Sequence, residues 1–325
     1  MPEVVILSPS FGRWSPEPVR VLQDAGLSVR RAGTGSPLTS QQVIDQLPGA
    51  AALVVGLDAI DAAVIGAAAR RGELRVIAKH GVGVDNIDVD AADRAGIPVV
   101  NVPALNSGAV ADLVLGLMLA LLRRIPEAQQ GLREGGWPVL AGPELSELTI
   151  GIAGFGRIGR GVARRLEGFD ASVAAFDPFL PPDAFGAVRR TGTLEELLET
   201  SDLVSLHLPG GQDGPLLDEA AIARMRPGAW LVNAARGELV DEHAVAQALR
   251  SGHLAGYAAD AFTAEPPTGS PLLEAPNTLL TPHMGAYTRA TNARMGVSAA
   301  RSIIAALAGA PLDHEVRPAP EEGRR

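Results

Sequence analysis

The sequence predicts an α/β protein with two doubly wound domains, and three observations support this. Short β-branched runs alternate with alanine-rich helical segments, a pattern typical of parallel βαβ units. The chain has 325 residues, which is long enough for two domains of ordinary size. One series of βαβ units precedes a long apolar helix and a second series follows it. We therefore expect one parallel sheet in each series.

The first series occupies about the first hundred residues. Its strands are expected at Val4–Leu7, Leu27–Arg31, Leu53–Val55, Val76–Lys79 and Val99–Asn101. Helices are expected between them at Glu17–Ala25, Ser40–Leu47, Ala59–Arg71 and Asp90–Arg94. Together these elements make one complete small doubly wound sheet.

An apolar run of ten residues, Leu113–Leu122, follows the first series. It is about half the length that spans a bilayer, and charged residues lie on both sides of it. We expect Ser107–Arg124 to form a buried helix. A Gly- and Pro-rich loop is then expected from Gly131 to Pro143.

The second series begins with a strand at Thr149–Ala153. Further strands are expected at Ser172–Phe176, Leu203–Leu208, Ala229–Asn233, Tyr257–Ala259 and Thr278–Leu280. One helix starts from Thr193 with Thr-Leu-Glu-Glu, a capping-box arrangement. A last helix over Thr288–Leu307 leads into a charged tail, Pro318–Arg325, that is expected to fray. No third, regulatory domain is expected.

Composition narrows the classes of partner. The 37 acidic residues outnumber the 28 basic ones, which argues against a nucleic-acid or anionic-membrane surface. The absence of cysteine excludes disulfides, thiolate catalysis and Cys-ligated zinc, and we expect no metal site. The N-terminus has neither the basic nor the long apolar region of a signal peptide. We expect a cytoplasmic protein without a membrane-spanning segment.

A glycine fingerprint lies at the start of the second series. The motif Gly154-Phe-Gly156-Arg-Ile-Gly159 directly follows an apolar strand and opens a helix. The first glycine permits a tight turn, the second lets the backbone approach a pyrophosphate, and the third allows close helix–strand packing. The free N–H groups of the helix N-terminus favour phosphate binding. The pattern predicts a Rossmann-type dinucleotide site.

An acidic residue completes the fingerprint. Asp177 ends the next strand, 18 residues after Gly159, where a carboxylate accepts hydrogen bonds from the adenosine ribose hydroxyls. No Arg or Lys follows it before Arg189, so nothing nearby is suited to a 2′-phosphate. The sequence therefore favours NAD over NADP as the cofactor. A purely structural glycine turn with a surface aspartate is the alternative.

Three chemical groups follow later strands of the same series. Arg236 comes just after one strand, Glu265 precedes two prolines after the next, and His283 lies between a proline and a glycine two residues on. An arginine can hold a carboxylate in bidentate fashion. A carboxylate on one imidazole nitrogen orients a histidine for proton transfer at the other nitrogen. Each residue alone has a structural explanation, such as pairing of Arg236 with Glu238 or Asp241.

Five motifs together resemble one known family. They are "KHGVGVDNID" (79–88), "GFGRIG" (154–159), "NAARGELVDE" (233–242), "DAFTAEPP" (260–267) and "LLTPHMGAYT" (279–288). In order and spacing they are similar to the D-isomer-specific 2-hydroxyacid dehydrogenases, nearest the branch of D-3-phosphoglycerate dehydrogenase. The resemblance covers about residues 50–310. It implies an Arg–Glu–His catalytic set on Arg236, Glu265 and His283, and a homodimer built on the cofactor domains, with Trp137 in a candidate contact loop.

The resemblance also implies binding residues and a domain arrangement. Cofactor contacts fall on Gly154, Gly156, Arg157, Ile158, Gly159, Asp177, His207, Pro209, Ala234, Ala235, Asp260 and Gly285, with Asp260 on the nicotinamide carboxamide. Substrate contacts fall on Lys79, Gly81, Val82, Gly83 and Arg236, the amides of the glycine loop receiving the carboxylate. Residues 1–100 and 288–325 would form a smaller flavodoxin-like substrate domain, and residues 101–287 the NAD-binding Rossmann domain.

Departures from the family pattern leave the substrate open. Glu265 argues against the related formate dehydrogenases, which carry glutamine at the matching position. Lys79 stands where phosphoglycerate dehydrogenases usually have arginine and phosphite dehydrogenase has lysine, so it indicates either a second anionic group on the substrate or a surface lysine. His80 is expected to be a pocket wall. The stretch "HLPGGQDGPLLD" (207–218) is shorter and richer in glycine than usual, so a more mobile loop is expected there.

The expected activity is the NAD-dependent interconversion of a D-2-hydroxy acid and its 2-oxo acid. Candidate substrates are 3-phosphoglycerate or another acid with a second anionic group, glyoxylate or hydroxypyruvate, and a phosphite- or phosphonate-type anion. The alternative from another class is a non-catalytic NAD(H)-sensing binding protein, since transcriptional corepressors resemble this family.

Overall fold

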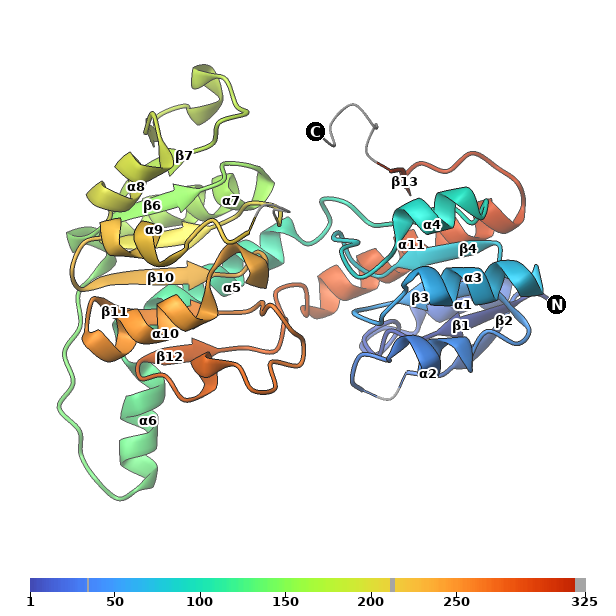
Figure 1. Cartoon of the computed structure of the whole chain (residues 1–325), viewed down its shortest axis with the longest axis horizontal. Coiled ribbons are helices and arrows are strands. Elements are labelled where there is room, and N and C mark those ends of the chain that lie inside the picture. The colour runs from blue at the N-terminus through green and yellow to red at the C-terminus, as the bar shows by residue number, and fades with distance from the viewer. Residues whose placement is uncertain (34, 211–213, 319–325) are drawn as a thin grey trace. The chain divides into compact units, whose positions relative to one another are not determined.

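A computed structural model describes residues 1–33, 35–210 and 214–318. The chain divides into two compact units (Figure 1). Unit 1 comprises Met1–Asn106 and Ala286–Arg325, and unit 2 comprises Ser107–Gly285. The sequence places these boundaries at 100/101 and 287/288, and the roles given there to the two domains remain proposals.

Unit 1 contains a six-stranded sheet in the order β13-β5-β4-β3-β1-β2. All neighbours pair in parallel except β13, which runs antiparallel to β5. The order β2-β1-β3-β4-β5 is the flavodoxin-like one expected from the sequence. The elements are β1 (Glu3–Ile6), α1 (Glu17–Asp24), β2 (Ser28–Arg31), α2 (Ser40–Ile44), β3 (Ala50–Val55), α3 (Ala62–Arg71), β4 (Val76–Lys79), α4 (Val89–Arg94), β5 (Val99–Val100), α11 (Arg289–Leu307) and β13 (Glu315–Val316).

Helices cover both faces of this sheet (Figure 1). On one face, α2, α3 and α4 enclose a core that includes Leu53, Val64 and Ile77. On the other face, α1 and α11 enclose a second core around Ile6 and Met295. A sheet covered on both faces buries its strands, which explains the continuous apolar runs in the sequence.

Unit 2 contains a seven-stranded, wholly parallel sheet in the order β12-β11-β10-β9-β6-β7-β8. Counted from β6, this is the Rossmann order 3-2-1-4-5-6 with one further strand. The elements are α5 (Ser107–Leu122), α6 (Ile125–Arg133), β6 (Thr149–Ala153), α7 (Arg157–Leu166), β7 (Ser172–Phe176), β8 (Arg189–Arg190), α8 (Leu194–Thr200), β9 (Leu203–Leu206), α9 (Glu219–Arg224), β10 (Ala229–Asn233), α10 (Glu242–Ser251), β11 (Leu254–Ala259) and β12 (Thr278–Leu280).

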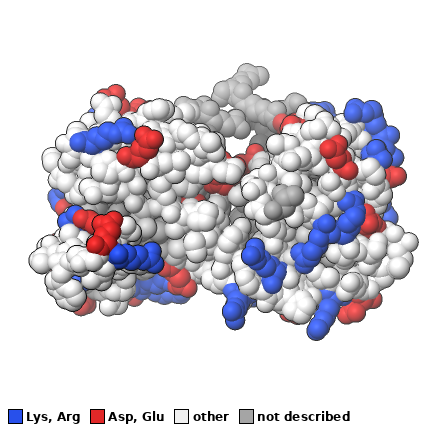
Figure 2. Space-filling view, turned by 90° about the horizontal axis from the view of Figure 1, so that it is seen from below, with Lys and Arg blue, Asp and Glu red and all other residues white. Residues whose placement is uncertain are grey.

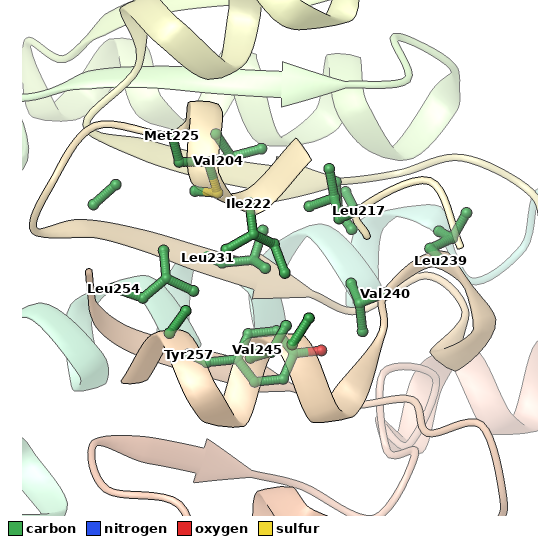
Figure 3. Packing of buried hydrophobic residues seen from close by; sticks show 14 of the residues in the cluster. Val204, Leu217, Ile222, Met225, Leu231, Leu239, Val240, Val245, Leu254 and Tyr257 are labelled. Carbon is green, nitrogen blue, oxygen red and sulfur yellow. The ribbon is translucent and has the colours of Figure 1, made fainter. Parts of the chain in front are cut away.

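Two cores lie on opposite faces of this second sheet. The apolar helix α5 packs with α7 over one face, and Met118 and Leu122 of α5 are fully or almost fully buried there. The core on the other face lies under α8, α9 and α10. Figure 3 shows part of it, with the Tyr257 ring beside Val245 of α10. The two α/β folds expected from the sequence are therefore confirmed.

The differences from the expected elements have local causes. Helix α3 begins at Ala62 because Asp61 caps it, accepting the N–H groups of Ala63 and Val64. Strand β3 begins three residues earlier than expected. The first three residues of the strand are alanines, whose low β propensity explains why the sequence did not indicate a strand there. The prediction that a loop begins at Gly131 was wrong, because α6 continues to Arg133.

Two further expectations need correction. Thr193 caps α8 by accepting the N–H of Glu196, but the Glu196 carboxylate accepts the N–H of Gly192 and not that of Thr193. The expected capping box is therefore only half formed. The short strands β8 (Arg-Arg) and β13 (Glu-Val) were missed, since neither is an apolar run. Most of the expected frayed tail, residues 319–325, lies outside the described residues, and so do positions 211–213 of the glycine-rich stretch.

The surface of the described chain carries both signs of charge. Figure 2 shows Lys and Arg, and Asp and Glu, in small groups separated by uncharged surface. Ion pairs on the described chain include Arg224 with Glu199 and Arg226 with Asp202. No helix in the described part of the chain is both long enough and apolar enough to cross a bilayer.

Candidate active site

The glycine turn between β6 and α7 lies at the point where the strand order of unit 2 reverses. Gly154 has a φ of +90°, and a Cβ there would lie 2.6 Å from the carbonyl oxygen of His207. A Cβ on Gly159 would lie 2.2 Å from the Gly154 carbonyl oxygen. Gly156, the N-cap of α7, has open space at its Cβ position. The turn is thus closed against protein on two sides and open where a pyrophosphate approaches a helix N-terminus, which fits NAD.

Asp177 directly follows β7, as the fingerprint requires. Its Oδ2 accepts the N–H of Phe155 at 2.9 Å, and its Oδ1 accepts the N–H of Phe179 at 3.0 Å. The buried Phe155 ring stacks on Phe185, with centroids 5.0 Å apart. The carboxylate therefore holds the glycine turn from the neighbouring strand, and each oxygen keeps a lone pair for a ribose hydroxyl.

The other residues expected at the cofactor lie beyond the carboxyl ends of neighbouring strands of unit 2. They are Arg157 and Ile158 at the start of α7, His207 and Pro209 after β9, Ala234 and Ala235 after β10, Asp260 after β11 and Gly285 after β12. Ligands of open α/β sheets bind at this edge. The sequence-derived set therefore lies along one edge of one sheet.

His207 lies at this edge as a half-buried residue whose ring atom Nδ1 is buried. Its Nε2 is 2.9 Å from the hydroxyl of Ser205, a residue of β9 that the sequence analysis did not single out. Burial lowers the pKa of His207 to about 4, so the imidazole is neutral at pH 7. Its Nδ1 is buried and has no hydrogen-bond partner in the described chain. A neutral ring with one unpaired polar atom suits a polar ligand better than an apolar core.

His283 and Glu265 are in direct contact. The Nδ1 of His283 lies 2.8 Å from Oε1 and 2.9 Å from Oε2 of Glu265. Glu265 Oε1 also accepts the N–H of Phe262 at 3.1 Å. His283 has a φ of +49°, an uncommon conformation for a side-chain-bearing residue, and its side chain is 37% exposed. With Nδ1 held by the carboxylate, the accessible ring presents Nε2 for proton transfer.

Asp260 fixes the turn that carries His283. Its Oδ1 accepts the hydroxyl of Thr281 at 2.6 Å and the N–H of Met284 at 2.8 Å, and its Oδ2 accepts the N–H of Gly285 at 2.8 Å. Burial raises the pKa of Asp260, and these hydrogen bonds and the nearby His283 oppose that rise. One carboxylate therefore holds the chain on both sides of the histidine.

Arg236 lies in the turn that follows β10. The Asn233 side chain shapes this turn, since its Oδ1 accepts the N–H of Ala235 at 3.1 Å and its Nδ2 donates to the Arg236 carbonyl oxygen at 2.7 Å. The guanidinium donates to the Ala235 carbonyl oxygen at 2.9 Å. Asp241, considered above as a partner of Arg236, caps α10 by accepting two N–H groups of its first turn.

The expected carboxylate loop of unit 1 follows β4. The carbonyl oxygen of Gly81 accepts the N–H of Val102 at 3.0 Å, and that of Val82 accepts the Asn101 side chain at 2.7 Å. For the N–H groups of Val82 and Gly83 the described chain provides no acceptor. With its carbonyls tied back, the loop has amides available to an anion.

Lys79 and His80, just before this loop, are both buried. The Lys79 ammonium donates to the Gly56 carbonyl oxygen at 2.6 Å and to Asn86 Oδ1 at 2.5 Å, so the interpretation of Lys79 as a surface lysine was wrong. His80 hydrogen-bonds through Nδ1 to the hydroxyls of two serines of the β1 loop. Burial lowers its pKa to about 4.

Within the described residues, no group of three or more His, Asp and Glu side chains is arranged to hold a metal ion. At its sheet edge, unit 2 has the glycine turn, Asp177, Arg236 and the Glu265–His283 pair. Sequence analysis missed the residues that hold these groups, chiefly Asn233 and Glu242. Both lie within the quoted motif of residues 233–242, as its first and last residues, but the sequence does not show what their side chains contact.

Comparison with known proteins identifies the family. Residues 115–285 match the model of the NAD-binding domain of D-isomer specific 2-hydroxyacid dehydrogenases. The chain belongs to the D-isomer specific 2-hydroxyacid dehydrogenase family. The matched segment covers more than half of the chain and contains the glycine turn, Arg236, Glu265 and His283. The cofactor expected from the fingerprint, NAD, is thereby confirmed.

Relatives of known name agree with this family. The chain is 41% identical over 273 residues to D-3-phosphoglycerate dehydrogenase of Mycobacterium tuberculosis, covering 82% of this chain and 51% of the relative. It therefore spans about half the length of the curated relatives it matches. A Thermus thermophilus structure has a TM-score of 0.85 at 36% identity, covering 97% of this chain and 99% of that one. The D-lactate dehydrogenase of Escherichia coli has a TM-score of 0.84 at 28% identity, with coverages of 97% and 100%.

Proposed function

We propose that this chain is an NAD-dependent dehydrogenase that interconverts a D-2-hydroxy acid and its 2-oxo acid. The observation that carries the proposal is the contact of Glu265 with Nδ1 of His283, at the same sheet edge as the glycine turn. A family fold without such a pair would bind NAD but would lack a proton donor. The names of the relatives, which include phosphoglycerate and lactate dehydrogenases, support the same reaction class.

Each group has a separate role in the proposed reaction. NADH, when bound, supplies the hydride that reduces C2 of the 2-oxo acid. Arg236 holds the substrate carboxylate and polarises the carbonyl group. Protonated His283, stabilised by Glu265, donates its Nε2 proton to the oxygen of C2. In the reverse direction neutral His283 accepts the proton of the substrate hydroxyl group.

The loop of residues 81–83 in unit 1 is assigned to binding a carboxylate of the substrate. Its N–H groups without an acceptor in the described chain support this assignment, since backbone amides bind anions without bringing a charge of their own. Asp260, Asp177 and His207 are assigned to the cofactor from their places at the sheet edge. Asp260 has a second task in this proposal, because it also holds the His283 turn.

The substrate is proposed to carry a second anionic group. Lys79 is buried and lies directly before the amide loop, and an ammonium beside a carboxylate-binding loop suits a substrate with a second anionic group. 3-Phosphoglycerate meets this requirement. Glyoxylate, hydroxypyruvate and a phosphite- or phosphonate-type anion are the alternative substrates, and a substrate panel separates them.

A homodimer and a cytoplasmic location complete the proposal. Four large apolar side chains of α6 and the segment after it are more than half exposed: Ile125, Leu132, Trp137 and Val139. An exposed apolar group of this size is typical of an interaction surface. Sedimentation velocity tests the dimer, and cell fractionation tests the location.

The deciding assay is NADH oxidation with a panel of 2-oxo acids, with and without a phosphate group, for the wild type and Lys79→Ala. We expect turnover with at least one acid, and a loss of kcat/KM in Lys79→Ala that is at least tenfold larger for phosphorylated acids. Equal losses on both classes would contradict the second-anion proposal. NADH binding without turnover of any acid would instead indicate a binding protein.

A further inference from the structure

The segment that carries Arg236 also contacts the loop that carries Glu265. A Cβ on Gly237 would lie 1.9 Å from the carbonyl carbon of Phe262 and 2.1 Å from the backbone nitrogen of Thr263. The peptide between Phe262 and Thr263 therefore packs directly on the Gly237 backbone. Only glycine leaves room for this contact, so the two loops are pressed together next to Arg236.

Glu242, the first residue of α10, ties the same loop at two points. Its Oε1 accepts the N–H of Thr263 at 2.9 Å, and its Oε2 accepts the hydroxyl of Ser270 at 2.5 Å. Thr263 lies two residues before Glu265, and Ser270 five residues after it. The two oxygens of the half-buried Glu242 carboxylate therefore bind the loop on both sides of Glu265.

The bracketed loop in turn fixes the carboxylate that contacts the histidine. Glu265 Oε1 accepts the N–H of Phe262, the residue just before the first tie of Glu242. Both Glu265 oxygens lie within 2.9 Å of His283 Nδ1. A shift of the loop would therefore move the carboxylate away from the imidazole.

We propose that Glu242 is a positioning residue that holds Glu265 against Nδ1 of His283. The inference rests on the proposed function, because the contact matters only if His283 transfers a proton. Two titratable groups of unit 2 interact electrostatically with members of this set, Asp260 with His283 and Tyr257 with Glu242.

A simpler role for Glu242 is to stabilise the N-terminus of α10 through its charge. The chain contains a matched control for that role. Glu219 is the first residue of α9 and, like Glu242, directly follows an aspartate that caps its helix. The Glu219 side chain is exposed. Replacing Glu219 removes the equivalent charge at the N-terminus of α9 and leaves the two hydrogen bonds of Glu242 to the loop in place.

The test compares Glu242→Ala and Glu242→Gln with Glu219→Ala by steady-state kinetics over pH, with NADH and the preferred 2-oxo acid. In Glu242→Ala we expect kcat to fall by about 10- to 100-fold, with KM for NADH unchanged. Activity requires protonated His283, which Glu265 stabilises. The alkaline limb of the kcat/KM profile should therefore move to lower pH in this variant.

The glutamine variant tests the geometry of the tie. Its oxygen can still accept the N–H of Thr263 and its NH₂ can donate to the Ser270 oxygen, so we expect most of the activity to return. Glu219→Ala should match the wild type. A Glu242→Ala enzyme with the wild-type pH profile and no more loss of kcat than Glu219→Ala would overturn the proposal.

A measurement without turnover separates this inference from the proposed function. The NMR titration of the His283 ring in the full chain, assigned with His283→Gln, should shift to lower pH in Glu242→Ala. A shift in a protein that turns over no 2-oxo acid would keep the positioning role and reject the proposed function. An unmoved titration in an active enzyme would reject the positioning role alone. If Glu242→Ala fails to fold, Ser270→Ala removes one tie and should give a smaller shift in the same direction.

Discussion

The glycine turn of unit 2 and the three loops that carry Arg236, Glu265 and His283 lie at the same sheet edge but are held in different ways. In the turn, Gly154 and Gly159 allow backbone to pack on backbone. A side chain at either position would displace the neighbouring backbone. In the loops, buried or half-buried polar side chains bind the backbone: Asn233 at Arg236, Glu242 beside Glu265 and Asp260 around His283. The first arrangement depends on the absence of side chains and the second on their hydrogen bonds.

This difference predicts different responses to mutation. A substitution in the turn should affect cofactor binding, whereas one in the loops should affect the chemical step with the cofactor still bound. The predictions below test that separation, from the largest expected effect to the smallest.

His283→Gln should give the largest effect. The variant keeps a polar side chain of similar size but has no group that can donate a proton near neutral pH. We expect kcat to fall by about a thousandfold, within the range for general acid–base catalysis. NADH affinity, measured by fluorescence titration, should remain within twofold of wild type. Unaltered turnover would remove His283 from the mechanism.

The pH dependence of stability should depend on His207. Its pKa in the folded chain is lowered to about 4 from 6.5, so its contribution to stability is complete above pH 6.5 and is lost as the pH falls towards 4. The shift corresponds to about 3 kcal/mol. Thermal unfolding at pH 7 and pH 4.5 should therefore show a larger drop in Tm for the wild type than for His207→Gln. Equal drops would contradict the burial of a neutral imidazole beside the turn.

Gly159→Ala should weaken cofactor binding by about tenfold or more. Its Cβ would lie 2.2 Å from the Gly154 carbonyl oxygen, and the turn must move to accommodate it. We expect KM for NADH to rise much more than kcat falls. Gly168→Ala, at a position with open space around the Cβ, is the matched control. A fall in kcat with unchanged NADH affinity would show that the two regions are not separable in this way.

Asp177→Asn should have the smallest effect. The amide oxygen can keep one of the two backbone hydrogen bonds, but the charge that repels a 2′-phosphate is lost. We expect KM for NADH to rise by about fivefold and the preference for NADH over NADPH to narrow, with kcat on NADH close to wild type. An unchanged NADH-to-NADPH ratio of kcat/KM would argue against a role of Asp177 in cofactor choice.

The same difference explains which features could be predicted from the sequence. The glycine turn is local and needs glycine at fixed spacings, so Gly154, Gly156 and Gly159 could be identified together with Asp177. Five strands, at 76–79, 149–153, 172–176, 229–233 and 278–280, have the predicted boundaries because each is a short run with clear ends. The NAD-binding fold follows from that local information.

The hydrogen bonds that hold the loops of Arg236, Glu265 and His283 could not be predicted in this way. Glu242 and Ser270 are 28 residues apart in the sequence and meet only because α10 and the β11 loop lie at one sheet edge. Glu242 and Glu219 both directly follow an aspartate that caps a helix, so their place in a helix does not show which of them binds a distant loop. The burial of Lys79 was missed for a related reason, since its partner Gly56 is 23 residues away on the neighbouring strand's loop.

The most direct test of the proposed function is the reduction of a 2-oxo acid of three or more carbons by the wild-type chain with NADH. We predict that one NADH is oxidised for each acid reduced, and that the isolated product is the D-2-hydroxy acid. An L product, or tight NADH binding without oxidation in the presence of every acid tested, would contradict the proposed function.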